Sequence, residues 1–361
     1  MNYKRYQSHF PVIGLNGQQI IQNASVCIVG CGGVGSPVAL YLTAAGIGKI
    51  GLIDFDKVDL SNLQRQILFT EVDINSEKSF VAKSRLNKMN SEIEIIAYNE
   101  KLNFYRACKI FSHYDLIIDG SDNFFTRYMV NDACCKIGKP LISASALKNK
   151  ANLAFFSSLH SCYRCLYPVV PTDDNSLLAT RNCSASGVLS PVVGVIGTMA
   201  ATMSINYFLK KTIKQELIAF NSETLAFTAF SYTQRPDCIS CVLHDYAEYS
   251  RINLTYTKPA EKTLLTDNLS HNAIIIDVRE EWEISIAPLD IAYTHLTLNK
   301  ILRGFVPKEW KKNSKLICIC KLGQRSYHAA KKLDNLGFLN VRSYAGGIAR
   351  YYKHRSLDIA Y

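Results

Sequence analysis

The chain has 361 residues, of which 48% are hydrophobic, so it is too long for one compact α/β domain and suits two domains with cores of their own. Its formal net charge of +11 suits an acidic partner such as a nucleotide, but lysine and arginine are scattered without a long basic run, which argues against nucleic-acid binding. The polar N-terminus has no apolar signal region and the cysteines cluster in CxxC pairs, so we expect a reducing, cytoplasmic location.

Short apolar runs alternate with amphipathic segments through the first half of the chain, as in βα units on a parallel sheet. We predict strands at Ser25–Val29, Lys49–Ile53, Ile93–Ala97, Leu116–Asp119 and Leu141–Ala144. Helices are predicted between them, at Ser36–Ala45, Ser76–Met89 and Phe124–Ile137. The predicted fold class is α/β, with a doubly wound, Rossmann-like, mostly parallel sheet.

After Leu147 the pattern changes to a long, loop-rich stretch, which is followed by the uncharged run Leu189–Leu209. This run is long enough to span a bilayer, but Pro191, two glycines, several hydroxyl residues and Asn206 favour a buried helix and no membrane contact.

A second βα alternation follows a polar segment, which we predict to be a linker over residues 249–262. Its strands are predicted at AIIIDV (273–278) and KLICIC (315–320), with helices near Glu280 and over Arg325–Leu336. The sequence therefore predicts a first domain over residues 1–248 and a smaller α/β domain over residues 263–361.

Gly30, Gly32 and Gly35 fit the pattern GxGxxG between a strand and a helix. Glycines let backbone amides approach a phosphate, and the helix N-terminus adds positive potential there. Asp54, near the end of the next strand, is placed to accept a hydrogen bond from a ribose hydroxyl. These features predict a nucleotide site and fit an NAD-dependent oxidoreductase as well as an ATP enzyme.

The residues after Asp54 distinguish the two nucleotides. Hydride transfer needs an apolar surface for nicotinamide, whereas cleavage of a triphosphate needs cations for the pyrophosphate and a carboxylate for Mg²⁺. Arg65 or Lys78 alone would be interpreted as a solvated surface charge, but together behind a glycine loop they favour ATP. The polar residues that accompany them are Asp56, Asn62, Gln64, Asp122 and Asn123.

The stretches GCGGVG (30–35), LIDFDKVDLSNLQRQ (52–66) and DGSDN (119–123), together with Lys78, resemble the MoeB/ThiF family, bacterial relatives of ubiquitin-activating enzymes, over residues 1–245. The resemblance implies a homodimer that uses ATP to adenylate the C-terminal glycine of a small ubiquitin-like sulfur-carrier protein of the MoaD/ThiS type, ending in Gly-Gly. It assigns Gly33 to the phosphate loop, Asp54 to the ribose, Asn62, Arg65 and Lys78 to the phosphates, and Asp122 to Mg²⁺.

The family also has an N-terminal arginine that reaches the ATP of the partner subunit. Arg5 is the matching residue, although its spacing departs from the family motif by a residue or so.

Two cysteine pairs, CYRC (Cys162, Cys165) and CISC (Cys238, Cys241), have the spacing of a tetrahedral Zn²⁺ site. Unmetallated pairs or a redox pair are the alternatives. The MoeB/ThiF resemblance places a structural zinc ion at the same positions, remote from the chemistry.

Cys183, in the polar stretch RNCSASGV, is either a small buried residue or an accessible thiol. The family resemblance implies that a cysteine here can form a thioester or an acyl disulfide with the carrier, although some members act without it.

Cys320 opens the stretch CKLGQRS between a strand and a helix. Backbone amides would surround its sulfur there, and the helix dipole with Arg325 would favour a thiolate or persulfide. This loop, IDVREEWE (276–283) and AGGIARYY (345–352) resemble a rhodanese domain over residues 262–361. The usual GHxxGA segment is replaced by ISIAPLDIA (284–292), which leaves the sulfur donor open.

The fused architecture implies that a persulfide on Cys320 attacks the acyl adenylate to give a carrier thiocarboxylate, in molybdopterin, thiamine (thiazole) or tRNA thiolation pathways. A cysteine desulfurase is the expected type of persulfide donor. One alternative is a scaffold that binds the carrier without catalysis. The other, an NAD-dependent oxidoreductase, leaves the CxxC pairs and the Cys320 loop without a purpose.

Overall fold

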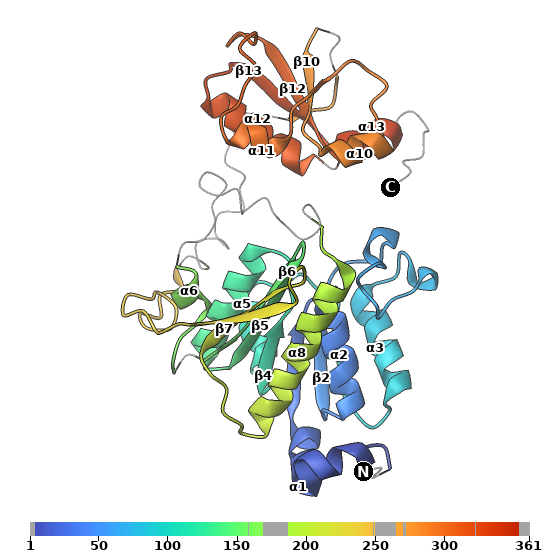
Figure 1. Ribbon diagram of the computed structural model, residues 1–361, viewed down its shortest axis with the longest axis vertical. Coiled ribbons are helices and arrows are strands. Elements are labelled where there is room, and N and C mark those ends of the chain that lie inside the picture. Colours follow the sequence, from blue (N-terminus) through green and yellow to red (C-terminus); the bar gives the residue numbers. More distant parts are fainter. Residues whose placement is uncertain are drawn as a thin grey trace. The chain divides into compact units, whose positions relative to one another are not determined.

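The computed structural model describes residues 4–157, 159–168, 187–247, 249, 265–269, 272–321 and 323–353. These residues form two compact units, the first between residues 4 and 249 and the second between residues 265 and 353 (Figure 1).

The first unit is built on a sheet with the strand order β3-β2-β1-β4-β5-β6-β7-β8. The first five strands in this order are parallel, and the last three run antiparallel to their neighbours. Their bounds are β1 Ser25–Val29, β2 Lys49–Ile53, β3 Glu94–Tyr98, β4 Leu116–Asp119, β5 Leu141–Leu147, β6 Lys150–Phe156, β7 Glu216–Asn221 and β8 Ala226–Ser231.

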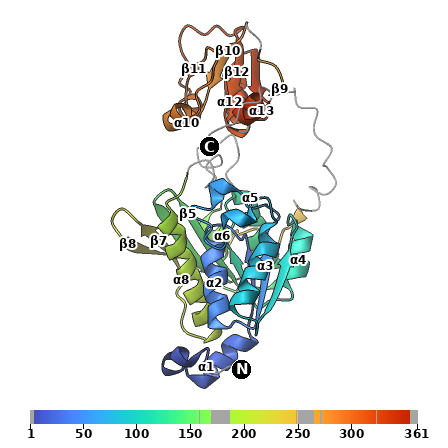
Figure 2. The same ribbon diagram turned by 90° about the vertical axis from the view of Figure 1, so that its right-hand side faces the viewer.

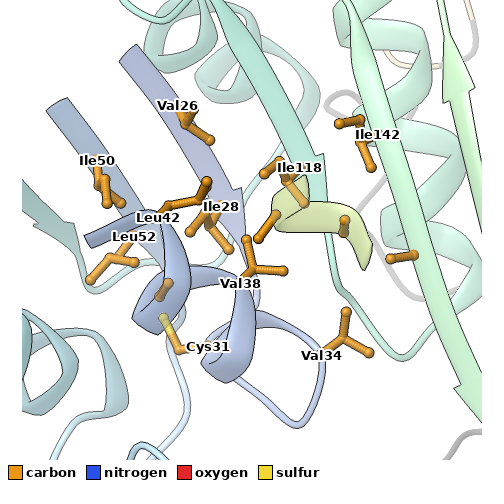
Figure 3. Packing of buried hydrophobic residues seen from close by; sticks show 14 of the residues in the cluster. Val26, Ile28, Cys31, Val34, Val38, Leu42, Ile50, Leu52, Ile118 and Ile142 are labelled. Carbon is orange, nitrogen blue, oxygen red and sulfur yellow. The ribbon is translucent and has the colours of Figure 1, made fainter. Parts of the chain in front are cut away.

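Helices cover both faces of this sheet, because successive side chains of each central strand point to opposite faces and both sets are apolar (Figure 2). On one face, Ile28 of β1 packs near Val38 and Leu42 (Figure 3). On the other face, the core includes Cys27 and Val29. The helices of this unit are α1 Phe10–Asn23, α2 Gly35–Ala45, α3 Lys78–Met89, α4 Phe104–Phe111, α5 Phe124–Ile137, α6 Tyr163–Leu166 and α8 Ser190–Phe208, with short 3₁₀ turns η1 Gln7–His9, η2 Leu60–Asn62 and η3 Glu71–Asp73.

Helix α8 is the uncharged run discussed above, and by length and composition alone it could cross a membrane. In the structure it packs against α2, β5 and β6 (Figure 2). The contact with α2 is so close that a β-carbon on Gly197 would lie 2.4 Å from Cγ of Pro37. We interpret α8 as a core helix of the first unit, as the glycine and hydroxyl residues predicted.

The predicted fold class is confirmed. The five predicted strands of the first unit occur within one or a few residues of their expected bounds. The antiparallel strands β6, β7 and β8 were not predicted from the sequence. Every residue of β8 is exposed, so this edge strand lacks the alternation of buried and exposed residues by which strands are recognised.

The second unit is a parallel five-stranded sheet with the order β11-β10-β12-β13-β9. The strands are β9 Leu265–Thr266, β10 Ile274–Asp277, β11 Thr294–His295, β12 Lys315–Ile319 and β13 Asn340–Tyr344. The helices are α10 Glu281–Ile286, α11 Leu298–Leu302, α12 Gln324–Asn335 and α13 Gly347–Lys353.

Candidate functional site

The glycine loop joins β1 to α2 and turns too tightly for any larger residue at two positions. Gly30 has a φ of +88°, in the region that favours glycine. A β-carbon on Gly35 would lie 1.8 Å from the carbonyl oxygen of Gly30. The lack of a side chain at Gly35 therefore lets α2 begin directly against the end of β1.

Asp54 ties the end of β2 to the glycine loop. Its carboxylate accepts hydrogen bonds from the backbone N–H of Cys31 (2.8 Å) and of Asp56 (2.9 Å). Burial raises the pKa of Asp54, while the positive charge of Lys78 and the two backbone N–H groups oppose this shift. The side chain is therefore held in one position at the edge of the cleft.

Two cations, Arg65 and Lys78, border the same cleft as the glycine loop. The Arg65 guanidinium donates to the side-chain oxygen of Asn62 at 3.2 Å, and the Gln66 amide donates to the same oxygen at 3.0 Å. Lys78, the first residue of α3, is only 4% exposed, and its Nζ lies 3.4 Å from Asp56. Both positive charges are thus oriented by polar neighbours before any ligand arrives.

The end of β4 contributes a third group of polar residues. Asp119 is buried, which raises its pKa, and it accepts a hydrogen bond from the backbone N–H of Ser121. Asp122 is exposed. Asn123 caps α5, since its side chain accepts from the N–H of Thr126 at 2.8 Å.

These groups surround a cleft of about 570 Å³ above the glycine loop. Its lining includes ten of the residues predicted from the sequence: Gly30, Gly32, Gly33, Asp54, Asp56, Asn62, Arg65, Lys78, Asp122 and Asn123. Gln64 is exposed and is not part of the lining, where Gln66 is found instead. Arg5 is not part of the lining either, and its guanidinium donates to the carbonyl of Met89 at 3.1 Å.

The cleft also has lining residues that the sequence did not reveal, among them Glu100, Lys101, Phe125 and Arg127. Arg127 lies one helical turn after the cap residue Asn123, and its guanidinium donates to the carbonyl of Ser121. A basic residue in the first turns of the helix after β4 is the only sequence signal for it, and that signal is weak.

The four cysteines of the two CxxC pairs come together in a buried cluster, although 76 residues separate Cys162 from Cys238. Their sulfur atoms all lie within 4.8 Å of one another, with separations of 3.5 Å for Cys162–Cys238 and for Cys165–Cys241. Four sulfurs at about 2.3 Å from a zinc ion would lie about 3.8 Å apart, so the donor set and its geometry fit tetrahedral Zn²⁺.

The surroundings of this cluster act differently on its thiols: they favour the thiolate at Cys162 and the neutral thiol at Cys238 and Cys241. A hydrogen bond from the Cys135 thiol lowers the pKa of Cys162 to about 5, although burial opposes the shift. Burial raises the pKa of Cys241, so a bound cation would be needed to keep that sulfur ionised. Arg164, between the first two cysteines, forms a buried ion pair with Asp132 of α5 at 2.6 Å.

Cys320 lies at the end of β12 and is 1% exposed. The backbone N–H of Gly323 donates to its sulfur at 3.1 Å. The carbonyl of Cys320 accepts from the N–H of Ile348, at the start of α13, which ties the start of the loop to that helix. Gly323 has a φ of +93°, and a β-carbon there would lie 2.9 Å from the backbone nitrogen of Gly346, so glycine is required.

Arg325 pairs with an acidic side chain of the second unit. Its guanidinium donates two hydrogen bonds to the carboxylate of Glu283 in α10. Cys183 lies outside the described residues. Cys318, two residues earlier on β12, is fully buried, and burial raises its pKa.

The chain matches two protein families. Residues 3–240 match the ThiF family, and residues 261–354 match the rhodanese-like domain. A relative from Danio rerio, "Adenylyltransferase and sulfurtransferase MOCS3", is 32% identical over 98% of this chain and 85% of its own length. A relative from Candida albicans, "Adenylyltransferase and sulfurtransferase UBA4", is 33% identical over 97% of this chain and 87% of its own length.

Solved structures agree with the sequence matches. A crystal structure of E. coli MccB with ATP superposes with a TM-score of 0.57 at 26% identity, covering 66% of this chain and 75% of that one. The predicted fusion of an adenylating domain with a rhodanese-like domain is confirmed. The chain belongs to the ThiF family and shares with its adenylyltransferase and sulfurtransferase relatives a C-terminal rhodanese-like domain.

Proposed function

We propose that this protein uses ATP to adenylate the C-terminal glycine of a small ubiquitin-like sulfur-carrier protein ending in Gly-Gly, and then converts that carboxylate to a thiocarboxylate. The observation that carries the proposal is the cleft in which Arg65, Lys78 and Asp122 surround the glycine loop. The names of the relatives describe both activities, adenylyl transfer and sulfur transfer.

In the adenylation step, the carrier carboxylate attacks the α-phosphate of ATP and pyrophosphate leaves. The charges of Arg65 and Lys78 stabilise the negative charge that develops on the departing pyrophosphate, and their hydrogen-bonded neighbours keep them oriented. Asp122 would hold Mg²⁺ together with phosphate oxygens, which is the mixed coordination that this ion prefers. The ion would supply further charge neutralisation on the phosphates.

In the sulfur-transfer step, the Cys320 thiolate attacks the outer sulfur of a donor persulfide and releases the donor thiolate. The terminal sulfur of the new Cys320 persulfide then attacks the acyl adenylate, a C–S bond forms, and AMP leaves. A thiol finally attacks the Cys320 sulfur of this acyl disulfide, so that the carrier thiocarboxylate is released and a protein disulfide remains for cellular thiol reductants to reopen. Cys183 is our candidate for that thiol, and the chemistry requires a persulfide donor such as a cysteine desulfurase.

Three further features belong to the proposal. The four-cysteine cluster holds a structural Zn²⁺. The location is the reducing cytoplasm, in keeping with cysteines that are all free within the described residues. The enzyme is a homodimer, in keeping with apolar side chains exposed on α1 and α2, namely Val12, Leu15 and Tyr41.

The deciding experiment is carrier-dependent exchange of pyrophosphate into ATP, followed by intact-mass measurement of the carrier after a persulfide donor is added. We expect exchange only with a carrier that ends in Gly-Gly, and a mass gain on the carrier that corresponds to replacement of one oxygen by sulfur. A carrier that binds without any exchange would show that the protein is a docking scaffold. Binding of NAD in preference to ATP would support the oxidoreductase alternative.

A further inference from the structure

Two buried serine hydroxyls lie next to the sulfur of Cys320. Ser326, in the first turn of α12, and Ser343, on β13, are both 0% exposed. The Ser326 Oγ lies 3.4 Å from the Cys320 Sγ, 3.0 Å from the carbonyl oxygen of Gly323 and 2.9 Å from the Ser343 Oγ. The Ser343 Oγ lies 3.5 Å from the Gly323 carbonyl oxygen. The sulfur, two hydroxyls and one carbonyl therefore form a connected polar group inside the second unit.

The hydrogen atoms available in this group allow two arrangements. When Cys320 is a thiol, its S–H can donate to the Ser326 oxygen, and the Ser326 hydroxyl donates to the Gly323 carbonyl. When the sulfur is an anion, the Ser326 hydroxyl can rotate to donate to it, while Ser343 donates to the Ser326 oxygen. In both arrangements each hydroxyl hydrogen has an acceptor, so that the change of charge leaves no buried donor without a partner.

We propose that Ser326, oriented by Ser343, is a positioning residue that donates a hydrogen bond to Cys320 whenever its sulfur is negatively charged. It acts with the Gly323 N–H, which donates to the same sulfur from the N-cap of α12. A hydrogen bond to a charged group contributes more than one to a neutral group, so the pair of serines favours the thiolate over the thiol. This proposal rests on the proposed role of Cys320 as the sulfur-carrying residue.

Charged groups also lie on the elements around the Cys320 loop. Arg325 of α12 is paired with Glu283 of α10, and Lys321 belongs to the loop itself. Arg350 of α13 is paired with Asp267, and the Asp277–Arg279 pair at the end of β10 is fully buried. Cys318 on β12 stays neutral because burial raises its pKa. A serine-to-alanine change leaves all these charges in place, so it isolates the contribution of the hydroxyl.

The test is the pH dependence of iodoacetamide alkylation at Cys320 in the full chain, followed by mass spectrometry of the peptide that contains it. In Ser326→Ala we expect the midpoint of the alkylation profile to move upward by about one pH unit, the size expected for loss of one hydrogen bond to a charged group. Ser343→Ala should move it in the same direction by less, because Ser326 keeps its hydroxyl but loses its orienting donor. A change that only loosened the loop would alter the plateau rate without moving the midpoint.

The controls separate this inference from the proposed function. Ser285→Ala, which removes an exposed hydroxyl on α10 that donates to the carbonyl of Glu281, should leave the profile unchanged. Cys108, which is partly exposed in the first unit, provides an internal reference in the same digest. An unchanged midpoint in both Ser326→Ala and Ser343→Ala would overturn the positioning role, even if sulfur transfer is observed. A shifted midpoint in a protein that transfers no sulfur would support the positioning role and count against the proposed function.

Discussion

The guanidinium of Arg325 donates two hydrogen bonds of 2.6 Å each to the carboxylate of Glu283. Glu283 also accepts a hydrogen bond from the backbone N–H of Glu280, which caps α10. One carboxylate thus joins the start of α12, immediately after the Cys320 loop, to the start of α10. The pair is 15% and 5% exposed, so it is largely shielded from water.

Replacing Glu283 by glutamine should lower the stability of the second unit by about 3 kcal/mol, because Arg325 would keep a mostly buried charge without its counter-ion. Both tryptophans of the chain, Trp282 and Trp310, lie in this unit, so denaturation followed by tryptophan fluorescence measures its stability directly. Glu281→Gln, on the exposed side of the same helix, is the matched control and should change little. Equal stabilities for the two variants would mean that the pair is not structural.

The same pair predicts how the second unit responds to acid. Burial acts to raise the pKa of Glu283, but the hydrogen bonds from Arg325 and from Glu280 hold it below the ordinary value of 4.5. A lowered pKa in the folded state contributes stability above the unfolded value, and this contribution is lost as the pH falls through the folded value. Tryptophan-monitored stability should therefore fall below about pH 4.5, and this fall should be smaller in Glu283→Gln.

Arg65→Ala should reduce carrier-dependent ATP–pyrophosphate exchange by at least about 100-fold, because the charge that meets the developing pyrophosphate is lost. Binding of the carrier should survive, which a pull-down assay can measure. The matched control is Arg85→Ala, since Arg85 pairs with Asp73 and is not part of the cleft lining. Exchange at the wild-type rate in the Arg65 variant would mean that the phosphates of ATP do not bind beside Arg65.

Elemental analysis of freshly purified, reduced protein should find one zinc ion per chain. Cys238→Ser should lose the metal and lower the calorimetric unfolding temperature of the first unit by about 10 °C, the shift that a loss of a few kcal/mol produces in a domain of this size. Cys135→Ser should keep the metal, because Cys135 neighbours the cluster but is not one of the four converging sulfurs. Metal-free wild-type protein of full stability would contradict the assignment.

Cys320→Ala should separate the two steps of the reaction. The carrier should still become an acyl adenylate, because every residue assigned to ATP lies in the first unit. It should not become a thiocarboxylate from a persulfide donor, although free sulfide at high concentration should bypass the defect as a nucleophile in its own right. Intact-mass analysis of the carrier distinguishes these products, with Cys318→Ala as the control on the same strand. A normal yield from the persulfide donor would reduce the second unit to a docking role.

Two inactive variants should restore activity when combined, if Arg5 acts on the ATP of the partner subunit. In a co-expressed mixture of Arg5→Ala and Arg65→Ala chains, each mixed dimer would have one site with both arginines intact. About a quarter of wild-type exchange activity is then expected, since half of the dimers are mixed and half of their sites are complete. Full activity of Arg5→Ala alone would instead mean that Arg5 does not act on ATP and that its role is the contact with the carbonyl of Met89.

The sequence predicted the parts of the site whose residues are close together in the chain. The glycine loop and Asp54 follow consecutive strands, and their spacing alone implies that they meet. We predicted Gln64 rather than Gln66 as a nucleotide-site residue, because a sequence motif does not show which way each side chain points. In the structure, the backbone N–H of Gln66 bonds to the carbonyl of Asn62, and this turn directs Gln66 inward and leaves Gln64 exposed.

Arg127 could not be predicted for a different reason. Its position depends on where α5 begins, which the cap residue Asn123 determines, and an arginine on a helix usually lies in solvent. The pairing of Arg325 with Glu283 was missed because these residues are 42 positions apart on two different helices. Contacts of this kind depend on the tertiary fold, and no local pattern encodes them.

Helix α8 has a consequence for the comparison of related sequences. Its Val193 lies against Gly33, where an added β-carbon would be 3.2 Å from the valine Cγ2 and 3.4 Å from the Cγ of Arg65. Val193, a purely aliphatic residue 160 positions after Gly33, and the stem of Arg65 thus both limit the space around the glycine loop. Members of a family with identical glycine and arginine motifs can therefore differ in nucleotide affinity through changes in α8, and an alignment restricted to the motifs would classify such proteins as equivalent.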